Sequence, residues 1–138
     1  MNLLLLLVLA GPAQTASPPT IAGQYVAVTE TEYEITLTLA STGRAQYEFV
    51  TWEADDPAPK HHEKILGKWS RSGNTLTVKL SSGKTAIYSV IPCLSYQEFE
   101  EAGCSLGLSL VNTTLSDGYG LNRFGLWNAA DLKFGDQP

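Results

Sequence analysis

The stretch YEITLTLASTGRAQYEFVTW, residues 33–52, decides the fold because its side chains alternate between apolar and polar. The alternation runs through 33–39 and again through 44–52. A period of two residues is typical of a β-strand with one buried face and one face in water. Residues 41–43, STG, have the composition of a three-residue hairpin loop. The stretch therefore predicts two adjacent antiparallel strands.

The same alternation continues along the chain. It runs through 74–80 and 85–91, on either side of a Ser-Gly turn. Further strands are expected at 106–111, 122–127 and 131–134. No segment has the convincing period of an amphipathic helix. We therefore expect an all-β fold, an antiparallel meander of about seven to nine strands that closes into a small barrel, as a single domain over 20–134.

The first residues predict export. Residues 1–16 read MNLLLLLVLAGPAQTA, and the apolar run at 3–10 has the length of a signal-peptide core. A membrane-spanning helix needs about 20 residues, so this run is too short to be one. Cleavage after Ala13 and cleavage after Ala16 both remain open. Pro12 stands where a lipoprotein would carry its lipidated cysteine, so we expect no lipid anchor and a periplasmic or secreted product.

The charge balance excludes some partners. The chain has 9 Lys and Arg against 14 Asp and Glu, a formal net charge of −5. Nucleic-acid binding relies on clustered basic residues, and anionic membranes attract them, so neither partner is expected. Apolar residues make up 43% and charged residues 17%, which indicates a globular chain.

The two cysteines, Cys93 and Cys104, flank residues 94–103. In an oxidising compartment we expect them to form a structural disulfide, with 94–103 as the enclosed loop. Closing a loop of about 12 residues stabilises a fold by roughly 3 kcal/mol. Free thiols, redox chemistry and metal binding are the alternatives. Two cysteines cannot complete a zinc site, however, and the spacing is not that of a C-x-x-C redox centre.

The only histidines, His61 and His62, lie near the end of the stretch EADDPAPKHHE at 53–63. Its two prolines and many charges predict an exposed loop. Imidazole and carboxylate ligands make His61 and His62 candidates for binding Cu(II), Ni(II) or Zn(II), with Asp55 and Asp56 nearby. A solvated charged loop is the simpler interpretation, and we expect no cofactor.

Catalytic motifs are missing from the sequence. It has no G-x-S-x-G elbow, no glycine-rich phosphate loop and no H-E-x-x-H zinc motif. Several glutamates could in principle supply an acid/base pair. Those at 30, 32 and 34 alternate as the wet face of a strand would, so we expect a protein that is not an enzyme.

A contact surface is expected in two places. The alternation puts Trp52 on the face opposite the apolar residues of its strand, beside the proline-rich loop. The loop between the cysteines holds Tyr96, Phe99, Glu100 and Glu101. A disulfide lowers the ordering cost of a binding loop, and an acidic loop suits a basic target.

Several short motifs resemble the N-terminal domain of the copper-resistance lipoprotein NlpE and related small lipocalin-like barrels of the bacterial envelope. They are GKWS at 67–70, SGNTLTV at 72–78, Gly83 and YSV at 88–90. The resemblance covers roughly 20–95 and implies a lipocalin-like envelope barrel. In that fold Trp69 is expected to point inward and to pack against Leu76 and Val78.

The chain departs from that family at its functional motif. The family carries a Cys-x-x-Cys in its first hairpin, whereas residues 26–30 here read VAVTE. The lipid anchor is also missing, so a copper-handling or stress-sensing activity is not carried over. We expect a non-catalytic exported envelope barrel acting as an interaction or binding module, such as a hydrolase inhibitor or an envelope-stress accessory protein. The alternative is a lipocalin-like carrier of a small apolar ligand, which would need a hollow barrel.

Overall fold

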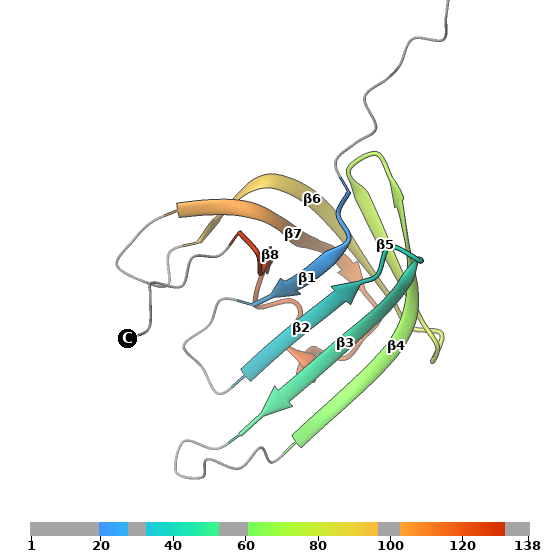
Figure 1. Cartoon of the computed structure of the whole chain (residues 1–138). Helices are drawn as coiled ribbons and strands as arrows, with labels where there is room; N and C mark the ends of the chain where they lie inside the picture. The colour runs from blue at the N-terminus through green and yellow to red at the C-terminus, as the bar shows by residue number, and fades with distance from the viewer. Residues whose placement is uncertain (1–19, 28–32, 53–60, 97–102, 132–138) are drawn as a thin grey trace, which may run out of the picture.

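The computed structural model describes residues 20–27, 33–52, 61–96 and 103–131. These residues form a closed barrel in which each strand pairs antiparallel with the next and β8 returns to β1 (Figure 1). Its strands are β1 (Gly23–Val26), β2 (Tyr33–Leu39), β3 (Arg44–Thr51), β4 (His61–Ser72), β5 (Thr75–Leu80), β6 (Thr85–Tyr96), β7 (Gly103–Thr113) and β8 (Leu126–Asn128). The predicted all-β meander, closed into a barrel, is confirmed. The expected export segment at 1–16 lies outside the described residues.

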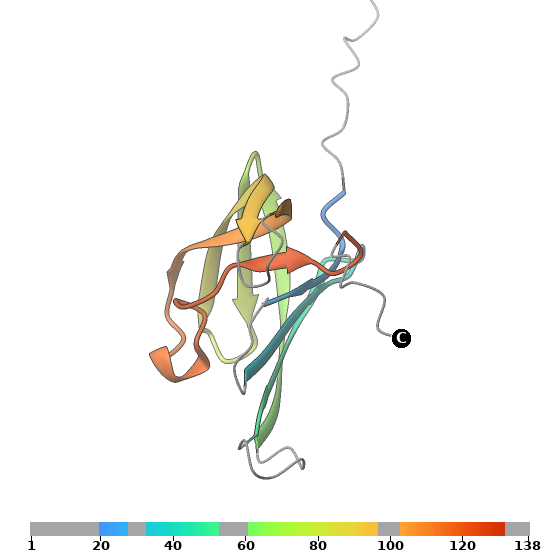
Figure 2. The same ribbon diagram turned by 90° about the vertical axis from the view of Figure 1, so that its left-hand side faces the viewer.

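Barrel closure depends on the short strand β8. Figure 2 shows β8 between β7 and β1, where Trp127 pairs with Gly107 on one side and with Val26 on the other. Closure leaves few unpaired strand edges, which limits edge-to-edge association. Within the described ranges no helix is long and apolar enough to cross a membrane.

The apolar side chains of the alternating strands fill the inside of the barrel. Ile35, Leu37 and Leu39 of β2 are each at most 1% exposed. Tyr25, Tyr47 and Tyr88 are among the largest fully buried side chains. The alternating residues of β2 and β3 therefore bury one face of the sheet inside the barrel, as expected for half-buried strands.

Trp69 packs against this core from β4 and is half-buried. It pairs with Val78 of β5, whereas Leu76 lies opposite Arg71. The indole N–H donates a hydrogen bond to the carbonyl oxygen of Ala40 at 2.8 Å. Trp69 thus ties β4 to the turn that joins β2 and β3.

Gly67 lets β4 approach β5 closely. A Cβ added at this position would lie 2.4 Å from the carbonyl oxygen of Lys79, a backbone atom that cannot rotate away. Glycine inside a strand often marks such a close approach. β4 is long and curved in Figure 1, and it pairs with β3 along its first part and with β5 along its second.

Two predicted loops contain strand residues. Residues 61–63 belong to β4, since His61 pairs with Thr51 of β3, so the loop predicted over 53–63 is wrong there. The loop predicted over 94–103 is wrong at both ends, because β6 continues to Tyr96 and β7 begins at Gly103. Prolines and charges suggested loops, but cross-strand pairing extends the ladders through these residues. The last strand is shorter than predicted, and 132–134 lie outside the described residues.

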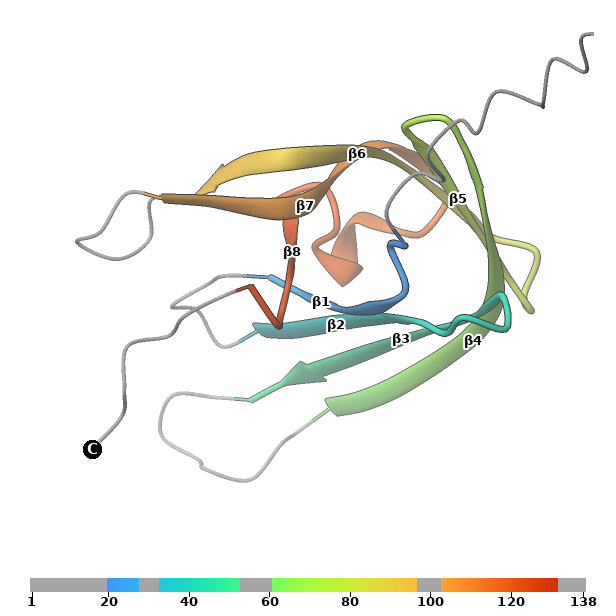
Figure 3. The ribbon, with the colours of Figure 1, turned by 45° about the horizontal axis from the view of Figure 1, so that its top comes forward.

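The segment between β7 and β8 covers one end of the barrel. It contains a 3-10 helix, η1 (Asp117–Tyr119), and it buries Leu115 and Leu121. The ring of Tyr119 lies 4.7 Å from that of Phe49 on β3, measured between centroids. In Figure 3 this orange segment lies within the outline of the strands. The segment therefore packs against the ends of β2, β3 and β4.

Candidate functional site

The middle of the barrel is filled by two tyrosines. The hydroxyl groups of Tyr47 and Tyr88 share a hydrogen bond between β3 and β6. Burial raises the pKa of both phenols well above the ordinary tyrosine value. The described residues leave no buried side-chain nitrogen or oxygen without a partner. This pair occupies space that an apolar ligand would need.

The β6–β7 hairpin extends beyond the rest of the barrel. β6 pairs with β5 only as far as Ser89, and β7 pairs with β8 only at Gly107 and Leu108. Residues 92–96 and 103–106 therefore have no strand partners beyond each other among the described ladders. Figure 3 shows this part of the hairpin projecting at the left. An isolated two-stranded ribbon is marginally stable in water, so the projection needs other support.

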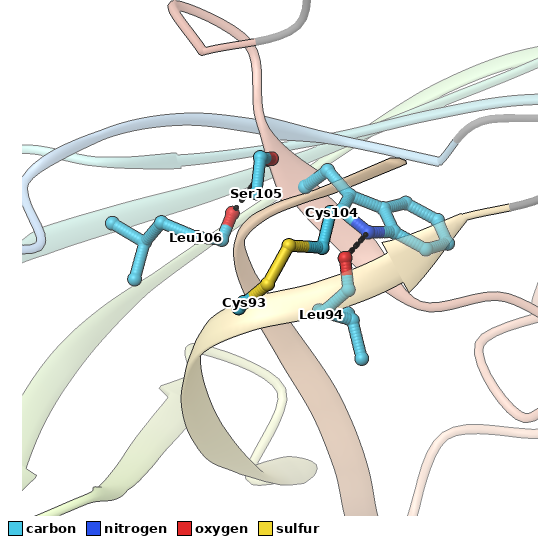
Figure 4. The surroundings of a disulfide bond; sticks show 6 residues. Cys93, Leu94, Cys104, Ser105 and Leu106 are labelled. Carbon is cyan, nitrogen blue, oxygen red and sulfur yellow. Dashed lines mark hydrogen bonds between the residues drawn. A yellow bond between two sulfur atoms is a disulfide. The ribbon is translucent and has the colours of Figure 1, made fainter. Parts of the chain in front are cut away.

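A disulfide between Cys93 and Cys104 supplies part of that support, as predicted (Figure 4). The two Cα atoms lie 4.9 Å apart. Cys93 sits in a bulge, because Ile91 pairs with Gly107 and Leu94 pairs with Ser105. The bulge places two residues of β6, one of them a proline, opposite a single residue of β7. The bond thus joins two strands near the hairpin tip instead of merely closing a loop.

Trp127 of β8 braces the same part of the hairpin. Its indole N–H donates to the carbonyl oxygen of Leu94 at 3.0 Å. Its ring meets the ring of Tyr96 edge-on, with centroids 6.2 Å apart. Tyr96 in turn lies over Gly103, where an added Cβ would come within 2.7 Å of the phenol oxygen. Aromatic cover of a cross-strand glycine stabilises a β-ladder.

The predicted contact residues fall into separate places. Trp52 is half-buried and directly follows β3. Tyr96 is half-buried because it packs against Trp127, so its main contact is internal. Phe99, Glu100 and Glu101 lie outside the described residues. The structure therefore does not bring Trp52 and Tyr96 into one surface through any described contact.

The two histidines lie on opposite faces of β4. His62 faces outward, where its Nε2 is 2.8 Å from Oε1 of Glu48. His61 lies at the barrel end, with Nε2 3.4 Å from Oε2 of Glu63. The pair therefore does not converge on one ion. Across the described residues, no group of three or more His, Cys, Asp or Glu side chains gathers as a metal site, and Asp55 and Asp56 lie outside those residues.

A pocket of about 340 Å³ opens at the barrel end beside His61. Tyr33, Phe49 and Tyr119 are its aromatic lining residues, and Glu34 and Glu63 are its carboxylates. Such a volume is at the low end for small-molecule sites. The pocket is bounded by the first residues of β2, the last of β3, the first of β4 and the η1 segment.

Glu63 is held in a short polar chain. The Tyr119 hydroxyl donates a hydrogen bond to Oε1 of Glu63 at 3.0 Å. This hydrogen bond raises the pKa of the Tyr119 phenol, because the phenol would have to ionise next to a carboxylate. The carboxylate is thus oriented from one side by a phenol and approached from the other by His61.

The sequence did not single out this pocket. The prolines and charges of 53–63 predict a loop at Glu63, and Tyr119 follows a turn-forming Asp-Gly pair with no signal that it returns to the barrel. The inward parity of Glu63 could have been found by continuing the ladder from Phe49, its cross-strand partner. The bracing role of Trp127 depends on the contact between distant strands and has no local signal.

No protein-family model, curated protein or solved structure matches the chain. The resemblance to the NlpE N-terminal domain therefore stays a prediction.

Proposed function

We propose that this protein is an exported, non-catalytic barrel that binds a partner protein with the tip of its β6–β7 hairpin. The observation that carries the proposal is the projection of residues 92–96 and 103–106 beyond the other strands. A barrel that served only as a compact domain would not need a ribbon with two free edges.

The described part of the hairpin, residues 92–96 and 103–106, is braced before any partner binds. The Cys93–Cys104 disulfide joins its strands, and Trp127 holds it to β8 through a hydrogen bond and a ring contact. Ordering a flexible segment on binding costs free energy, so a stem that is already rigid favours affinity. The bulge at Pro92 also blunts the outer edge of β6 against pairing with stray strands.

The residues between β6 and β7 indicate the chemistry of the partner. Residues 97–102 read QEFEEA, with three glutamates and one phenylalanine. An acidic segment with an aromatic side chain suits a basic surface that offers an apolar contact. A basic hydrolase of the cell envelope has this character, and so the proposed activity is inhibition of such an enzyme or an accessory role in envelope stress.

Location in a bacterial periplasm or outside the cell is part of the proposal. The apolar run at 3–10 supports export, and the disulfide suits an oxidising compartment. N-terminal sequencing of the product from its own host should begin at Gln14 or Ser17. A product that keeps Met1 and stays in the cytoplasm would refute this part.

The filled interior argues against the carrier alternative. Tyr25, Tyr47 and Tyr88 are at most 1% exposed, and two of them bond to each other inside the barrel. A carrier of a small apolar ligand needs that volume to be empty. We therefore do not propose transport of an apolar ligand through the barrel interior.

The test compares charge removal at two places. A basic hydrolase, lysozyme, serves as the first probe, and binding and inhibition are measured at moderate salt. Removing two charges at the tip, Glu100→Gln with Glu101→Gln, should weaken binding about tenfold or more. The matched control, Glu34→Gln with Glu48→Gln, removes the same charge from the barrel wall and should have little effect.

Two outcomes would contradict the proposal. Equal weakening by the wall control would mean that net charge alone attracts the probe. The second outcome is that the tip variant weakens binding of neither lysozyme nor any envelope protein. The hairpin would then not be a binding element. Opening the disulfide with Cys93→Ser and Cys104→Ser should weaken specific binding while the barrel stays folded.

A further inference from the structure

We propose that the pocket at the barrel end binds a small organic cation, with the ammonium group placed beside the carboxylate of Glu63. This inference goes beyond the proposed function, since it concerns a different surface and a different class of ligand. It does not depend on whether the hairpin binds a protein.

The charges that line the pocket favour a cation. Glu34 and Glu63 are its carboxylates, and the described lining residues include no Lys or Arg. Among the lining residues that the structure describes, an anionic ligand would face these carboxylates with His61 as its one basic partner. Burying a charge is costly unless it is paired, so the pocket selects against anions and favours ligands that pair with Glu63.

Aromatic rings form the walls around this carboxylate. Phe49 lies directly across the β3–β4 ladder from Glu63. The rings of Phe49 and Tyr119 lie 4.7 Å apart, tilted by 53°, and Tyr33 lines the pocket as well. Aromatic faces attract ammonium groups through their quadrupole, and recognition of quaternary ammonium ligands commonly uses several rings. The pocket thus combines a carboxylate with an aromatic enclosure.

The carboxylate is positioned before a ligand arrives. Glu63 is on a paired strand, and the hydroxyl of Tyr119 holds one of its oxygen atoms at 3.0 Å. The second oxygen is 3.4 Å from the His61 ring, a long contact that leaves this oxygen only weakly engaged. A ligand ammonium group can therefore bind Oε2 without breaking the hydrogen bond from Tyr119.

Choline and its neutral isostere 3,3-dimethylbutan-1-ol provide a direct test. The two molecules have nearly the same shape and differ in the positive charge. Each is titrated into the purified full-length chain at low salt and followed by amide chemical shifts in NMR spectra. We expect choline to shift the amides around the pocket, among them Thr51 and Gly118, and to bind at least about fivefold more tightly than the isostere.

A matched pair of variants locates the interaction. Glu63 and Glu48 are each 35% exposed, and each approaches a histidine, but they lie on opposite faces of the barrel wall. Glu63→Gln should weaken choline binding about fivefold or more and leave binding of the isostere unchanged. Glu48→Gln removes the same charge outside the pocket and should change neither affinity by more than about twofold.

Several results would overturn the inference. Equal affinity for choline and for the isostere would mean that charge is not recognised, and this comparison needs no variant. The absence of any choline-induced shift at the pocket amides would also refute the site. If Glu48→Gln weakens choline binding as much as Glu63→Gln, the cation follows net charge and not this carboxylate. None of these results affects the test of the hairpin, which uses a protein probe and variants at the tip.

Discussion

Removing one hydroxyl from the pair of tyrosines inside the barrel should destabilise the protein more than removing both. Tyr47 and Tyr88 are at most 1% exposed, and their hydroxyl groups are hydrogen-bonded to each other. Tyr88→Phe leaves the Tyr47 hydroxyl buried with no partner. A buried polar group left unpaired costs about 1–3 kcal/mol, so we expect a loss of that size in the free energy of unfolding.

The double variant separates the lost hydrogen bond from the cost of the unpaired hydroxyl. Tyr47→Phe with Tyr88→Phe removes both polar groups and keeps both rings in the core. Replacing both partners by apolar groups of the same shape is nearly neutral in other proteins. We therefore expect the double variant to lose less stability than either single variant. The coupling free energy should then exceed the loss of one single variant, about 1–3 kcal/mol.

Urea unfolding followed by tryptophan fluorescence measures this double-mutant cycle. The slope of the unfolding free energy against urea should stay constant, because the surface exposed on unfolding hardly changes. Tyr33→Phe is the control, since Tyr33 is half-buried and lines the pocket at the barrel end. Loss of its hydroxyl should change stability by less than about 0.5 kcal/mol. Additive losses in the cycle would refute the coupling of the two hydroxyl groups.

Three further predictions use the same unfolding measurement. Trp69→Ala should lower the free energy of unfolding by at least about 2 kcal/mol because it removes core contact and a hydrogen bond. Trp52→Ala should lower it much less, and equal losses would mean that the core face is misassigned. Gly67→Ala should cost about 1–3 kcal/mol because its Cβ would overlap a backbone oxygen, while Gly118→Ala has room and should be nearly neutral. The two buried tyrosine phenols have raised pKa values, so they keep their protons in the folded state above the ordinary pKa of 10.0, where the unfolded chain loses them. Their contribution to the free energy of unfolding should therefore be constant below about pH 10. At higher pH it should fall by about 1.4 kcal/mol per pH unit for each phenol. A flat profile between pH 9 and pH 11.5 would contradict the raised pKa values.

Local alternation was enough to determine the class of fold. In residues 33–39 and 44–49 each side chain's polarity follows its face, and a tight turn joins neighbouring strands. Two strands and their pairing therefore follow from the sequence. The disulfide was also predictable, because the chain offers two cysteines and a single possible bond. The strands depend on residues that are neighbours in sequence, and the disulfide has only one possible pairing.

The functional surfaces depended on contacts between distant strands. Whether residues 61–63 form a loop or a ladder is decided by β3, which pairs with them, and not by their own charges.

The projecting hairpin exists because β5 and β8 end before β6 and β7 do, and no strand's own sequence specifies where its neighbours stop. The pocket requires the η1 segment to return to β4, so that Tyr119 meets Glu63 across 56 positions of the chain. The sequence by itself determined which face of β2, β3 and β5 is buried. Only barrel closure decided which of those faces meet, because strand register, bulges and strand lengths act together around the ring.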